Sequence, residues 1–319
     1  MKTIGVLTSG GDAPGMNAAV RAVVRTAIAN GMTVKGIRRG YNGLMEDDVI
    51  DLGARDVSDI IQLGGTMLYS ARSSRFKTEE GLAEAMATCK KHGIEGIVVI
   101  GGDGSFRGAR DLSLRGIPCV GIPATIDNDI SSTEYTIGFD TAMNTVIEMV
   151  DRLRDTCDSH ARCSVVEVMG RRAGHIALRT GLSVGAVAIL VPERDTTIEE
   201  VIEKIERTRK LGKKHFIVMV AEGVGGVDEM AKKIEAVTGI ETRGTVLGHV
   251  QRGGSPTVRD RVIASQMGFE AVNLLKEGIG NRVVAYKFGK IVNYDIYEAL
   301  NMNKPFDEYM YLVADTTSI

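Results

Sequence analysis

The chain has 319 residues, of which 44% are hydrophobic and 25% are charged, and its formal net charge is −2. These values are those of an ordinary globular protein, and the weak negative charge argues against a general nucleic-acid binder. No run approaches the roughly 20 apolar residues that span a bilayer, and the first residues lack the apolar core of a secretion signal. A chain of this length predicts two domains, and we expect a cytoplasmic protein.

The four cysteines are scattered, with neither a CxxC pair nor a metal-like spacing with the five histidines. This usage indicates free, buried thiols in a reducing compartment. Glycine is frequent at 38 residues and proline rare at 6, so flexible backbone builds the turns. Such backbone suits the close approach of main-chain N–H groups to a ligand.

The first 30 residues predict a strand, a glycine-rich turn and a helix. We expect the strand over residues 2–8, the turn over 9–15 and the helix over 17–30, where apolar residues recur at helical spacing. Such a turn places bare N–H groups and a helix N-terminus around an anion. Its spacing matches neither GxGxxG nor the Walker pattern. The alternative is a tight connection with no ligand, and we favour phosphate binding.

A second glycine-rich turn lies at residues 101–105. It follows an expected helix over 79–92, capped by Thr78, and a strand over 94–100 whose apolar run is typical of a buried parallel sheet. Asp103 suits Mg2+, which takes one or two carboxylates and completes its shell with water and phosphate oxygens. The alternative is that Asp103 only caps the following helix. Two such turns favour a nucleotide–magnesium site.

Residues 121–129 combine a strand end with acidic side chains. They follow an apolar run over 117–120 and place Asp127 and Asp129 on either side of an amide. Such residues are depleted from sheets, and strand-end loops are where open α/β proteins carry their chemistry. A hydrophilic turn is the alternative. The glycine-rich turns elsewhere in the chain favour a functional loop.

Strands and helices alternate through the rest of the chain. The expected elements are helix 140–156, strand 164–168, strand 186–191, helix 197–211, strand 215–220, helix 228–238, strand 245–250, helix 260–277, strand 283–286 and helix 294–301. This alternation predicts an α/β fold with mainly parallel sheets and right-handed crossovers. No linker marks a domain boundary, so we expect closely packed domains between which the chain crosses more than once.

Arginines in the second half gather at predicted strand ends. They are Arg162, Arg171, Arg172, Arg243 and Arg252, with Glu222 and His249 in similar positions. Guanidinium groups recognise phosphate dianions through paired hydrogen bonds, which favours a phosphorylated substrate over solvated surface arginines. A nucleotide–magnesium site, an acidic pair and a phosphate site together indicate phosphoryl transfer. That reaction needs positioning, a cation and a base for the acceptor hydroxyl.

Five motifs give the chain a resemblance to a known family. They are residues 8–17, 101–105, 123–129, 169–171 and 248–256. In this order they closely resemble the bacterial ATP-dependent 6-phosphofructokinases. The resemblance implies two Rossmann-like three-layer domains with mainly parallel sheets. It assigns ATP and magnesium to residues 1–138 plus about 256–304, and fructose 6-phosphate to about 139–255 plus 305–319.

The resemblance also implies a glycolytic kinase that transfers the γ-phosphoryl group of ATP to the 1-hydroxyl of fructose 6-phosphate, with Mg2+. By similarity, Asp127 is the general base and Asp129 assists it. Thr125 would contact the transferring phosphoryl group, and Arg171 and the Gly11 backbone would stabilise its charge. The matching ATP-binding positions, of which Asp103 would also hold the metal, are Gly11, Arg72, Ser73, Gly102, Asp103, Gly104 and Ser105.

Sugar-phosphate positions are implied as well. From one subunit they are Thr125, Ile126, Asp127, Met169, Gly170, Arg171, Glu222, His249, Val250, Gln251 and Arg252, and from a neighbour Arg162 and Arg243. This sharing implies a homotetramer with shared active sites. No nucleic-acid or membrane partner is expected.

Three alternative functions are left open. Pyrophosphate-dependent members tend to carry an acid after the Asp103 position and a lysine before the Thr125 position. Here Gly104 and Ala124 stand there, which favours ATP, although Ala124 departs from the usual glycine. A kinase for another ketose phosphate, such as tagatose 6-phosphate, is hardly excluded. A nucleotide-sensing protein without turnover is disfavoured by the intact catalytic positions.

The resemblance further implies an effector site for ADP as activator and phosphoenolpyruvate as inhibitor, between subunits. The matching positions are Arg21, Arg25, Asp59, Arg154, Gly185, Lys213, Lys214 and His215. Three positions depart from the pattern: Val187 replaces a metal-binding glutamate, Leu211 a long polar or basic side chain, and Ala54 an arginine of some members. Loss of a carboxylate and a cation predicts weakened allosteric control.

Overall fold

The computed structural model describes residues 1–318, which group into two compact units. Unit 1 comprises Met1–Ile126, Ile130–Thr141 and Arg252–Lys304. Unit 2 comprises Asp127–Asp129, Ala142–Gln251 and the described residues from Pro305 onward. In the part of the chain that is described, every helix is too short or too polar to cross a membrane.

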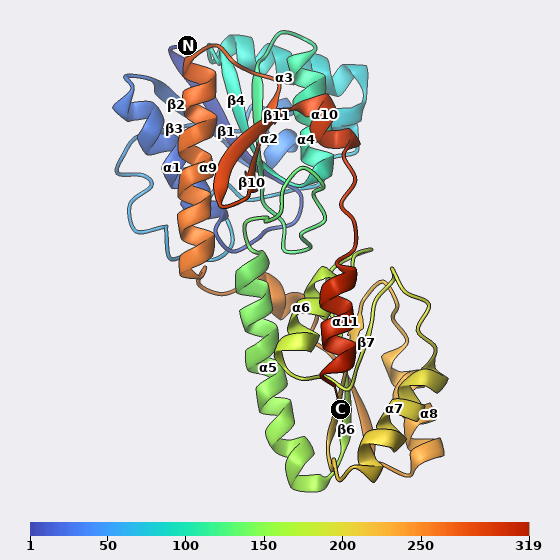
Figure 1. Ribbon diagram of the computed structural model, residues 1–319. Coiled ribbons are helices and arrows are strands. Elements are labelled where there is room, and N and C mark those ends of the chain that lie inside the picture. Colours follow the sequence, from blue (N-terminus) through green and yellow to red (C-terminus); the bar gives the residue numbers. More distant parts are fainter. Residues whose placement is uncertain (319) are drawn as a thin grey trace. The chain divides into compact units, whose positions relative to one another are not determined.

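Unit 1 is built on a seven-stranded sheet with helices on both faces (Figure 1). Its elements are β1 (Thr3–Ser9), α1 (Met16–Ala29), β2 (Thr33–Ile37), α2 (Gly40–Met45), β3 (Val49–Leu52), η1 (Arg75–Lys77), α3 (Glu79–Lys91), β4 (Gly96–Gly101), α4 (Asp103–Ser113), β5 (Cys119–Pro123), α9 (Val258–Lys276), β10 (Arg282–Lys287), β11 (Lys290–Asp295) and α10 (Ile296–Asn301). The strand order is β11-β10-β5-β4-β1-β2-β3, with antiparallel pairing only at the β3 and β11 edges.

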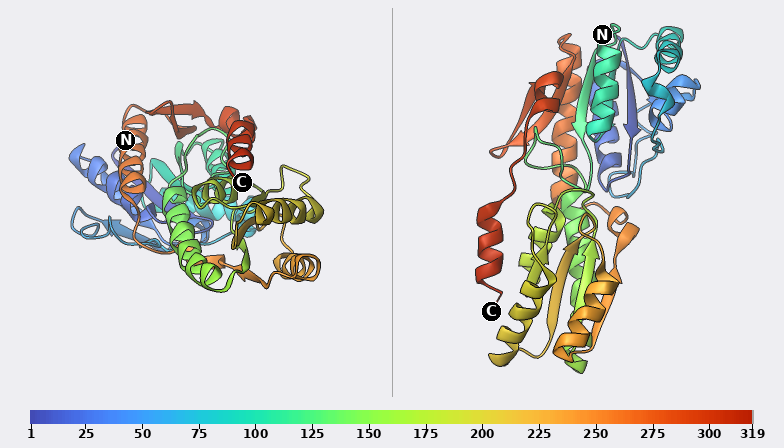
Figure 2. Two further views of the ribbon diagram at one scale, coloured as in Figure 1. Left: turned by 60° about the horizontal axis from the view of Figure 1, so that its bottom comes forward. Right: turned by 90° about the vertical axis from the view of Figure 1, so that its right-hand side faces the viewer.

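The central strands of unit 1 are buried because helices cover both faces of the sheet. Every residue of β4 is buried, and α1 and α9 pack side by side on one face (Figures 1 and 2). Leu7, Ile97 and Val99 belong to a core cluster with residues of α2, α3, α4 and α10 on the other face. This parallel arrangement brings the carboxyl ends of β1, β4 and β5 to one edge of the sheet.

Unit 2 is built on a four-stranded, all-parallel sheet in the order β7-β8-β6-β9. Its elements are α5 (Phe139–His160, whose first three residues group with unit 1), β6 (Cys163–Val168), α6 (His175–Ser183), β7 (Ala188–Leu190), α7 (Ile198–Lys210), β8 (Phe216–Ala221), α8 (Val227–Thr238), β9 (Thr242–Val246), η2 (Gly248–Arg252) and α11 (Glu308–Thr316). Helices α7 and α8 lie side by side and share a core cluster with Val165, Val218 and Val220 of the sheet (Figure 1).

Two expected elements of the second half are present with different limits. The strand expected over residues 245–250 is β9, which begins at Thr242 and ends at Val246, and residues 248–252 form the 3-10 turn η2. The helix expected from residue 294 begins at Ile296, because residues 290–295 form strand β11 against β10. Helices α2, α6 and α11 and strand β3 were not expected.

Candidate active site

The carboxyl ends of β1, β4 and β5 bring three loops together at one edge of the unit 1 sheet. Ser9 is in register with Gly101, and Gly101 with Pro123. The Ser105 hydroxyl donates to the Ser9 carbonyl at 3.2 Å, and the Ala124 N–H donates to the Gly101 carbonyl at 3.0 Å. Both glycine-rich turns and the start of the acidic stretch therefore lie side by side.

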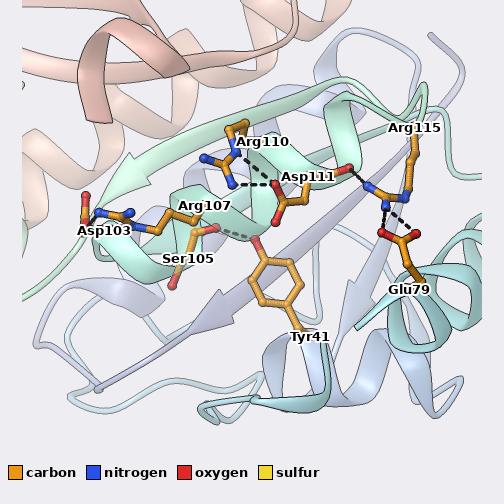
Figure 3. A network of polar contacts seen from close by, with 8 residues as sticks. All are labelled: Tyr41, Glu79, Asp103, Ser105, Arg107, Arg110, Asp111 and Arg115. Carbon is orange, nitrogen blue, oxygen red and sulfur yellow. Dashed lines mark hydrogen bonds and ion pairs between the residues drawn. The ribbon is translucent and has the colours of Figure 1, made fainter. Parts of the chain in front are cut away.

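Helix α4 begins at Asp103, so the N–H groups of its first turn face this edge. The Asp103 carboxylate accepts hydrogen bonds from Arg107 Nη2 at 2.8 Å and Nε at 3.2 Å (Figure 3). The two side chains are 41% and 58% exposed, so water weakens this ion pair. A ligand can therefore displace Arg107 at low cost. Arg107 was not among the expected site residues, although its four-residue spacing from Asp103 indicates such a pair.

Tyr41 supports the same turn from the core side of α4. Its hydroxyl donates to the Ser105 carbonyl at 2.5 Å (Figure 3). Its ring stacks on Phe76 with centroids 4.0 Å apart. A Cβ on Gly108 would lie 2.6 Å from this ring, so α4 packs directly on it. Burial raises the pKa of Tyr41 well above its usual value, which keeps the hydroxyl a donor.

Asp103 is the carboxylate expected to hold a magnesium ion. Among residues 1–318, no three or more His, Cys, Asp or Glu side chains gather in a way that could hold a metal. This is compatible with Mg2+, which binds through one or two carboxylates and takes further ligands from water and phosphate. The half-exposed Asp103 carboxylate, at the first turn of α4, meets that requirement.

The segment before η1 is tied to the first glycine-rich turn. The Gly10 N–H donates to the Ala71 carbonyl at 3.3 Å, and the Ser70 hydroxyl donates to the Gly10 carbonyl at 2.7 Å. The Ser73 hydroxyl accepts from the Phe76 N–H at 3.2 Å. Arg72, which is exposed, thus lies in a segment that hydrogen bonds hold on both sides of it.

Arg252 lies against the same glycine-rich turn. Its Nη1 donates to the Asp12 carbonyl at 3.1 Å, and a Cβ on Gly11 would lie 2.7 Å from that nitrogen. Gly11 therefore lets the guanidinium approach the main chain. The structure brings Arg252, expected to bind the sugar phosphate, beside an expected nucleotide position.

Thr125 is held by the segment that follows the acidic stretch. The Thr136 hydroxyl donates to the Thr125 carbonyl at 2.6 Å, and the Ile137 N–H donates to the Pro123 carbonyl at 3.0 Å. Ala124 pairs with Ile137 in an isolated parallel bridge. The main chain on both sides of Ala124 is thus fixed, and Ile126 after it is fully buried.

The two acids that follow have different surroundings. Asp127 is 6% exposed, and Asn128 after it has a left-handed φ of 51°. This conformation turns the chain sharply between the two carboxylates. Asp129 is more accessible, and its Oδ2 lies 3.9 Å from Arg171 Nη1. The Arg171 side chain is 66% exposed, so it can reorient toward a ligand.

In unit 2, two polar side chains shape the loop after β6. Glu222 Oε1 accepts hydrogen bonds from the N–H groups of Gly170, at 3.2 Å, and Arg171. Gln251, which is fully buried, accepts from the Met169 N–H at 3.1 Å. Glu222 and Gln251 thus hold main chain in this structure, in positions where substrate contacts were expected. His249 and Val250 of η2 are exposed.

Arg162 and Arg243 gather elsewhere, on Glu241. Arg162 Nε donates to one carboxylate oxygen at 2.7 Å and Arg243 Nη2 to the other at 2.6 Å. The guanidinium groups, that of Arg162 first, lower the pKa of Glu241. Arg162 immediately precedes β6 and Arg243 is the second residue of β9. Both lie at the amino ends of the strands, opposite the edge that carries Met169 and Arg171.

Three expected effector residues converge in unit 2. Arg154 Nη1 lies 3.4 Å from His215 Nε2, and Arg154 Nη2 donates to the Val184 carbonyl. Lys213 Nζ donates to the Ser318 carbonyl at 3.3 Å. Burial, followed by the charge of Arg154, lowers the pKa of Lys213. Arg154, Lys213 and His215 therefore form a basic cluster.

The other expected effector positions are divided between the units. Lys213 and Lys214 line a pocket of about 320 Å³ together with Arg209, and Gly185 has a left-handed φ of 60°. The positions in unit 1 are Arg21 and Arg25 on α1, and Asp59 in the loop after β3.

Comparison with known proteins finds close relatives. A family model described as Phosphofructokinase matches residues 3–275. An ATP-dependent 6-phosphofructokinase of Clostridium botulinum is 55% identical over 318 residues, covering 100% of both chains.

Solved structures share the fold. Phosphofructokinase from Saccharomyces cerevisiae aligns with a TM-score of 0.89 and 34% identity, covering 100% of this chain and 48% of that chain, so this chain spans about half of it. A pyrophosphate-dependent phosphofructokinase from Marinobacter aquaeolei aligns with a TM-score of 0.86 over 97% of this chain and 86% of that chain, at 23% identity, which bears on the fold alone. The expected α/β fold with mainly parallel sheets is confirmed.

Proposed function

The chain belongs to the phosphofructokinase family, and we propose on that basis that it transfers the γ-phosphoryl group of ATP to the 1-hydroxyl of fructose 6-phosphate. This reaction is the committed step of glycolysis. The observation that carries the proposal is 55% identity, over the full length of both chains, to a relative named as ATP-dependent. Asp103, Asp127 and Arg171 are all present, whereas a protein that only sensed nucleotide has no need of all three.

ATP rather than pyrophosphate is the proposed donor. A Cβ on Gly104 would meet no heavy atom of the described chain within 4 Å, so there is open space beside Asp103. That space suits the α-phosphate of ATP, and an acidic side chain there would repel it. Ala124 is likewise small and neutral. The fold does not decide the donor, because a pyrophosphate-dependent relative shares it.

The nucleotide is proposed to bind unit 1. The first turn of α4 and the Gly11 turn offer main-chain N–H groups to phosphate oxygens, and Arg72 and Ser73 lie in the segment tied to that turn. Mg2+ held by Asp103 would neutralise charge that develops on the phosphates. Arg107 would then exchange its partner Asp103 for solvent or phosphate.

Asp127 is proposed as the general base for the 1-hydroxyl, assisted by Asp129. Its near-complete burial strengthens electrostatic interactions with a reacting group. Thr125 and the Gly11 main chain would contact the transferring phosphoryl group. Arg171 would stabilise the negative charge in transit.

Fructose 6-phosphate is proposed to bind the loop Met169–Arg171 and the residues from His249 to Arg252. Glu222 and Gln251 would keep the first of these segments in shape. At about 3.3 Å per residue, the two ends of the six-residue strand β6 lie about 17 Å apart. Arg162 and Arg243 are therefore proposed to serve a neighbouring subunit's site, which supports a homotetramer.

ADP and phosphoenolpyruvate are proposed effectors of the basic cluster of Arg154, Lys213 and His215, because the Arg154 and Lys213 cations suit phosphate groups. A cytoplasmic location is part of the same proposal. It is supported by the four cysteines, all of which are buried as free thiols.

A coupled assay with fructose 6-phosphate, Mg2+ and either ATP or pyrophosphate tests the function, and we expect turnover with ATP. Asp127→Ser should lower kcat by about 10²–10⁴-fold while sparing fructose 6-phosphate binding. The same substitution at the exposed Asp195 is the control. Turnover only with pyrophosphate, or preferentially with tagatose 6-phosphate, would reassign the donor or acceptor. Nucleotide binding without turnover would indicate a sensing protein.

A further inference from the structure

Asp260 is a fully buried carboxylate to which the proposed mechanism gives no role. It lies in the first turn of α9. The Tyr135 hydroxyl and the Gly138 N–H donate to its Oδ1 at 2.6 and 2.7 Å. The N–H and hydroxyl of Thr141 donate to Oδ2 at 2.9 and 2.5 Å. Because a buried charge is costly unless hydrogen bonds match it, these four donors amount to a built site for one carboxylate.

All four donors come from residues 135–141, and this segment in turn holds the Thr125 loop. Thr136 and Ile137 lie between Tyr135 and Gly138 in the chain. Their bonds to the carbonyls of Thr125 and Pro123, at 2.6 and 3.0 Å, fix the main chain at the end of β5. Asp260 is thus connected to the Thr125 carbonyl through one short segment, residues 135–141, which is hydrogen-bonded to both.

The same segment packs against the first glycine-rich turn without room for a methyl group. A Cβ on Gly15 would lie 2.6 Å from Ile137 Cγ2 and 3.5 Å from Asp260 Cβ. A Cβ on Gly138 would lie 2.6 Å from Ala13 Cβ. A shift of residues 135–141 is therefore transmitted to Ala13 and Gly15 of the first glycine-rich turn as well as to Thr125.

We propose that Asp260 is a positioning residue for phosphoryl transfer. Its carboxylate fixes residues 135–141 as the common support of the Thr125 loop and the Gly11 turn, the two groups that meet the transferring phosphoryl group. This inference rests on the proposed function. Asp260 acts through other residues, so its loss lowers kcat and spares the binding of fructose 6-phosphate, most of whose expected contacts lie in unit 2. A displacement of about 1 Å in such groups can cost roughly 100-fold in rate.

Asp260→Asn tests the role of the carboxylate while nearly preserving its shape. An amide presents one acceptor oxygen and one donor nitrogen. Whichever way it lies, the main-chain N–H of Gly138 or of Thr141 therefore faces another donor. We expect kcat to fall by about 10–100-fold. The dissociation constant of fructose 6-phosphate, measured by calorimetry, should stay within about 2-fold, with a native circular dichroism spectrum.

Tyr135→Phe is a milder second variant, because it removes one donor and introduces no clash. Its kcat should fall by about 3–10-fold with fructose 6-phosphate binding unchanged. Ala264→Gly, at a buried position on the same helix, is the control for lost stability and should keep the wild-type kcat.

A wild-type kcat in Tyr135→Phe would overturn the inference, even if Asp260→Asn failed to fold. An equal loss of kcat in Ala264→Gly would overturn it too, because the loss would then follow stability. A wild-type chain that turns over none of the substrates would instead refute the proposed function.

Discussion

Gly11 is best understood from what a side chain there would displace. A Cβ would lie 2.7 Å from Arg252 Nη1 and 3.2 Å from its Cζ, and that guanidinium donates to the Asp12 carbonyl. The far end of an arginine moves easily, so a methyl group would push the guanidinium away and leave the main chain in place. A methyl group at Gly11 would therefore displace the positive charge of Arg252 and would hardly affect folding.

Gly11→Ala is therefore expected to move the Arg252 guanidinium away from bound fructose 6-phosphate and to raise the KM for this substrate by about 10-fold or more. A hydrogen bond to a charged group, such as the one that Arg252 would lose, is worth about 1.5–3 kcal/mol. The thermal midpoint should hardly change. Gly53→Ala, an exposed position of unit 1 where the nearest atom is a carboxylate oxygen at 3.3 Å, is the matched control. An unchanged KM in Gly11→Ala would contradict the part assigned to Arg252.

Single residues differ in how far the sequence can identify them. Asp103 and Asp127 could be picked out because each follows an apolar strand pattern with a carboxylate that no strand needs. Tyr41 could not, because its contact is the Ser105 carbonyl, 64 positions away, and any residue supplies a carbonyl. Asp260 looked like an ordinary first-turn acid, and the four donors that match it lie more than 100 positions earlier.

Secondary structure elements were predictable where one local pattern decides them. The apolar runs of β4 and β8 are completely buried, and such short, β-branched runs are typical of the central strands of parallel sheets. The predicted Thr78 cap of α3 is confirmed, since its hydroxyl accepts from the Gly81 N–H at 3.1 Å. Helix caps can be predicted from sequence because the donor and the acceptor lie within one turn of the chain.

Edge elements were harder, because pairing decides them. Strand β9 has only one buried residue out of five, and its register with β6 rather than its apolar content sets its limits. Strand β11 pairs with β10 across a turn at Phe288 and Gly289, whose φ values are 51° and 75°. Phe is unusual in this left-handed region, so Gly289 stands without the Asn or Asp that usually precedes it in such a turn, and the turn signal is weak.

At the scale of the whole molecule, the positions of Arg162 and Arg243 allow us to test whether subunits share their active sites. Both lie at the amino edge of the unit 2 sheet, and the loop Met169–Arg171 follows the carboxyl end of β6. If each site takes these arginines from a neighbour, two inactive variants can complement each other. Mixing Asp127→Ser and Arg162→Ser subunits should restore about one quarter of the sites.

This complementation is measured as fructose 1,6-bisphosphate formation after the two variants are unfolded and refolded together. Each variant refolded alone is the control, and mixing them without refolding shows whether subunits exchange. Activity no higher than the sum of the separate variants would mean that Arg162 acts within its own subunit.

Regulation is the remaining property of the assembly, and two departures from the family pattern bear on it. Val187 is fully buried in the unit 2 core cluster, and its hydrocarbon side chain has no oxygen with which to bind a metal, unlike that of a glutamate. Leu211 is 72% exposed as the C-cap of α7, two residues before Lys213. Both departures are expected to weaken the binding of a phosphorylated effector to the basic cluster.

We therefore expect phosphoenolpyruvate at micromolar concentration to change the rate at subsaturating fructose 6-phosphate by less than about 5-fold, the lower end of ordinary coupling. Leu211→Lys should strengthen the inhibition by adding a cation to the cluster. Leu114→Lys, at the similarly exposed C-cap of α4, should leave it unchanged and is the matched control. Strong inhibition of the wild-type chain, relieved by ADP, would contradict the expectation, because the effector would then need neither the carboxylate nor the cation.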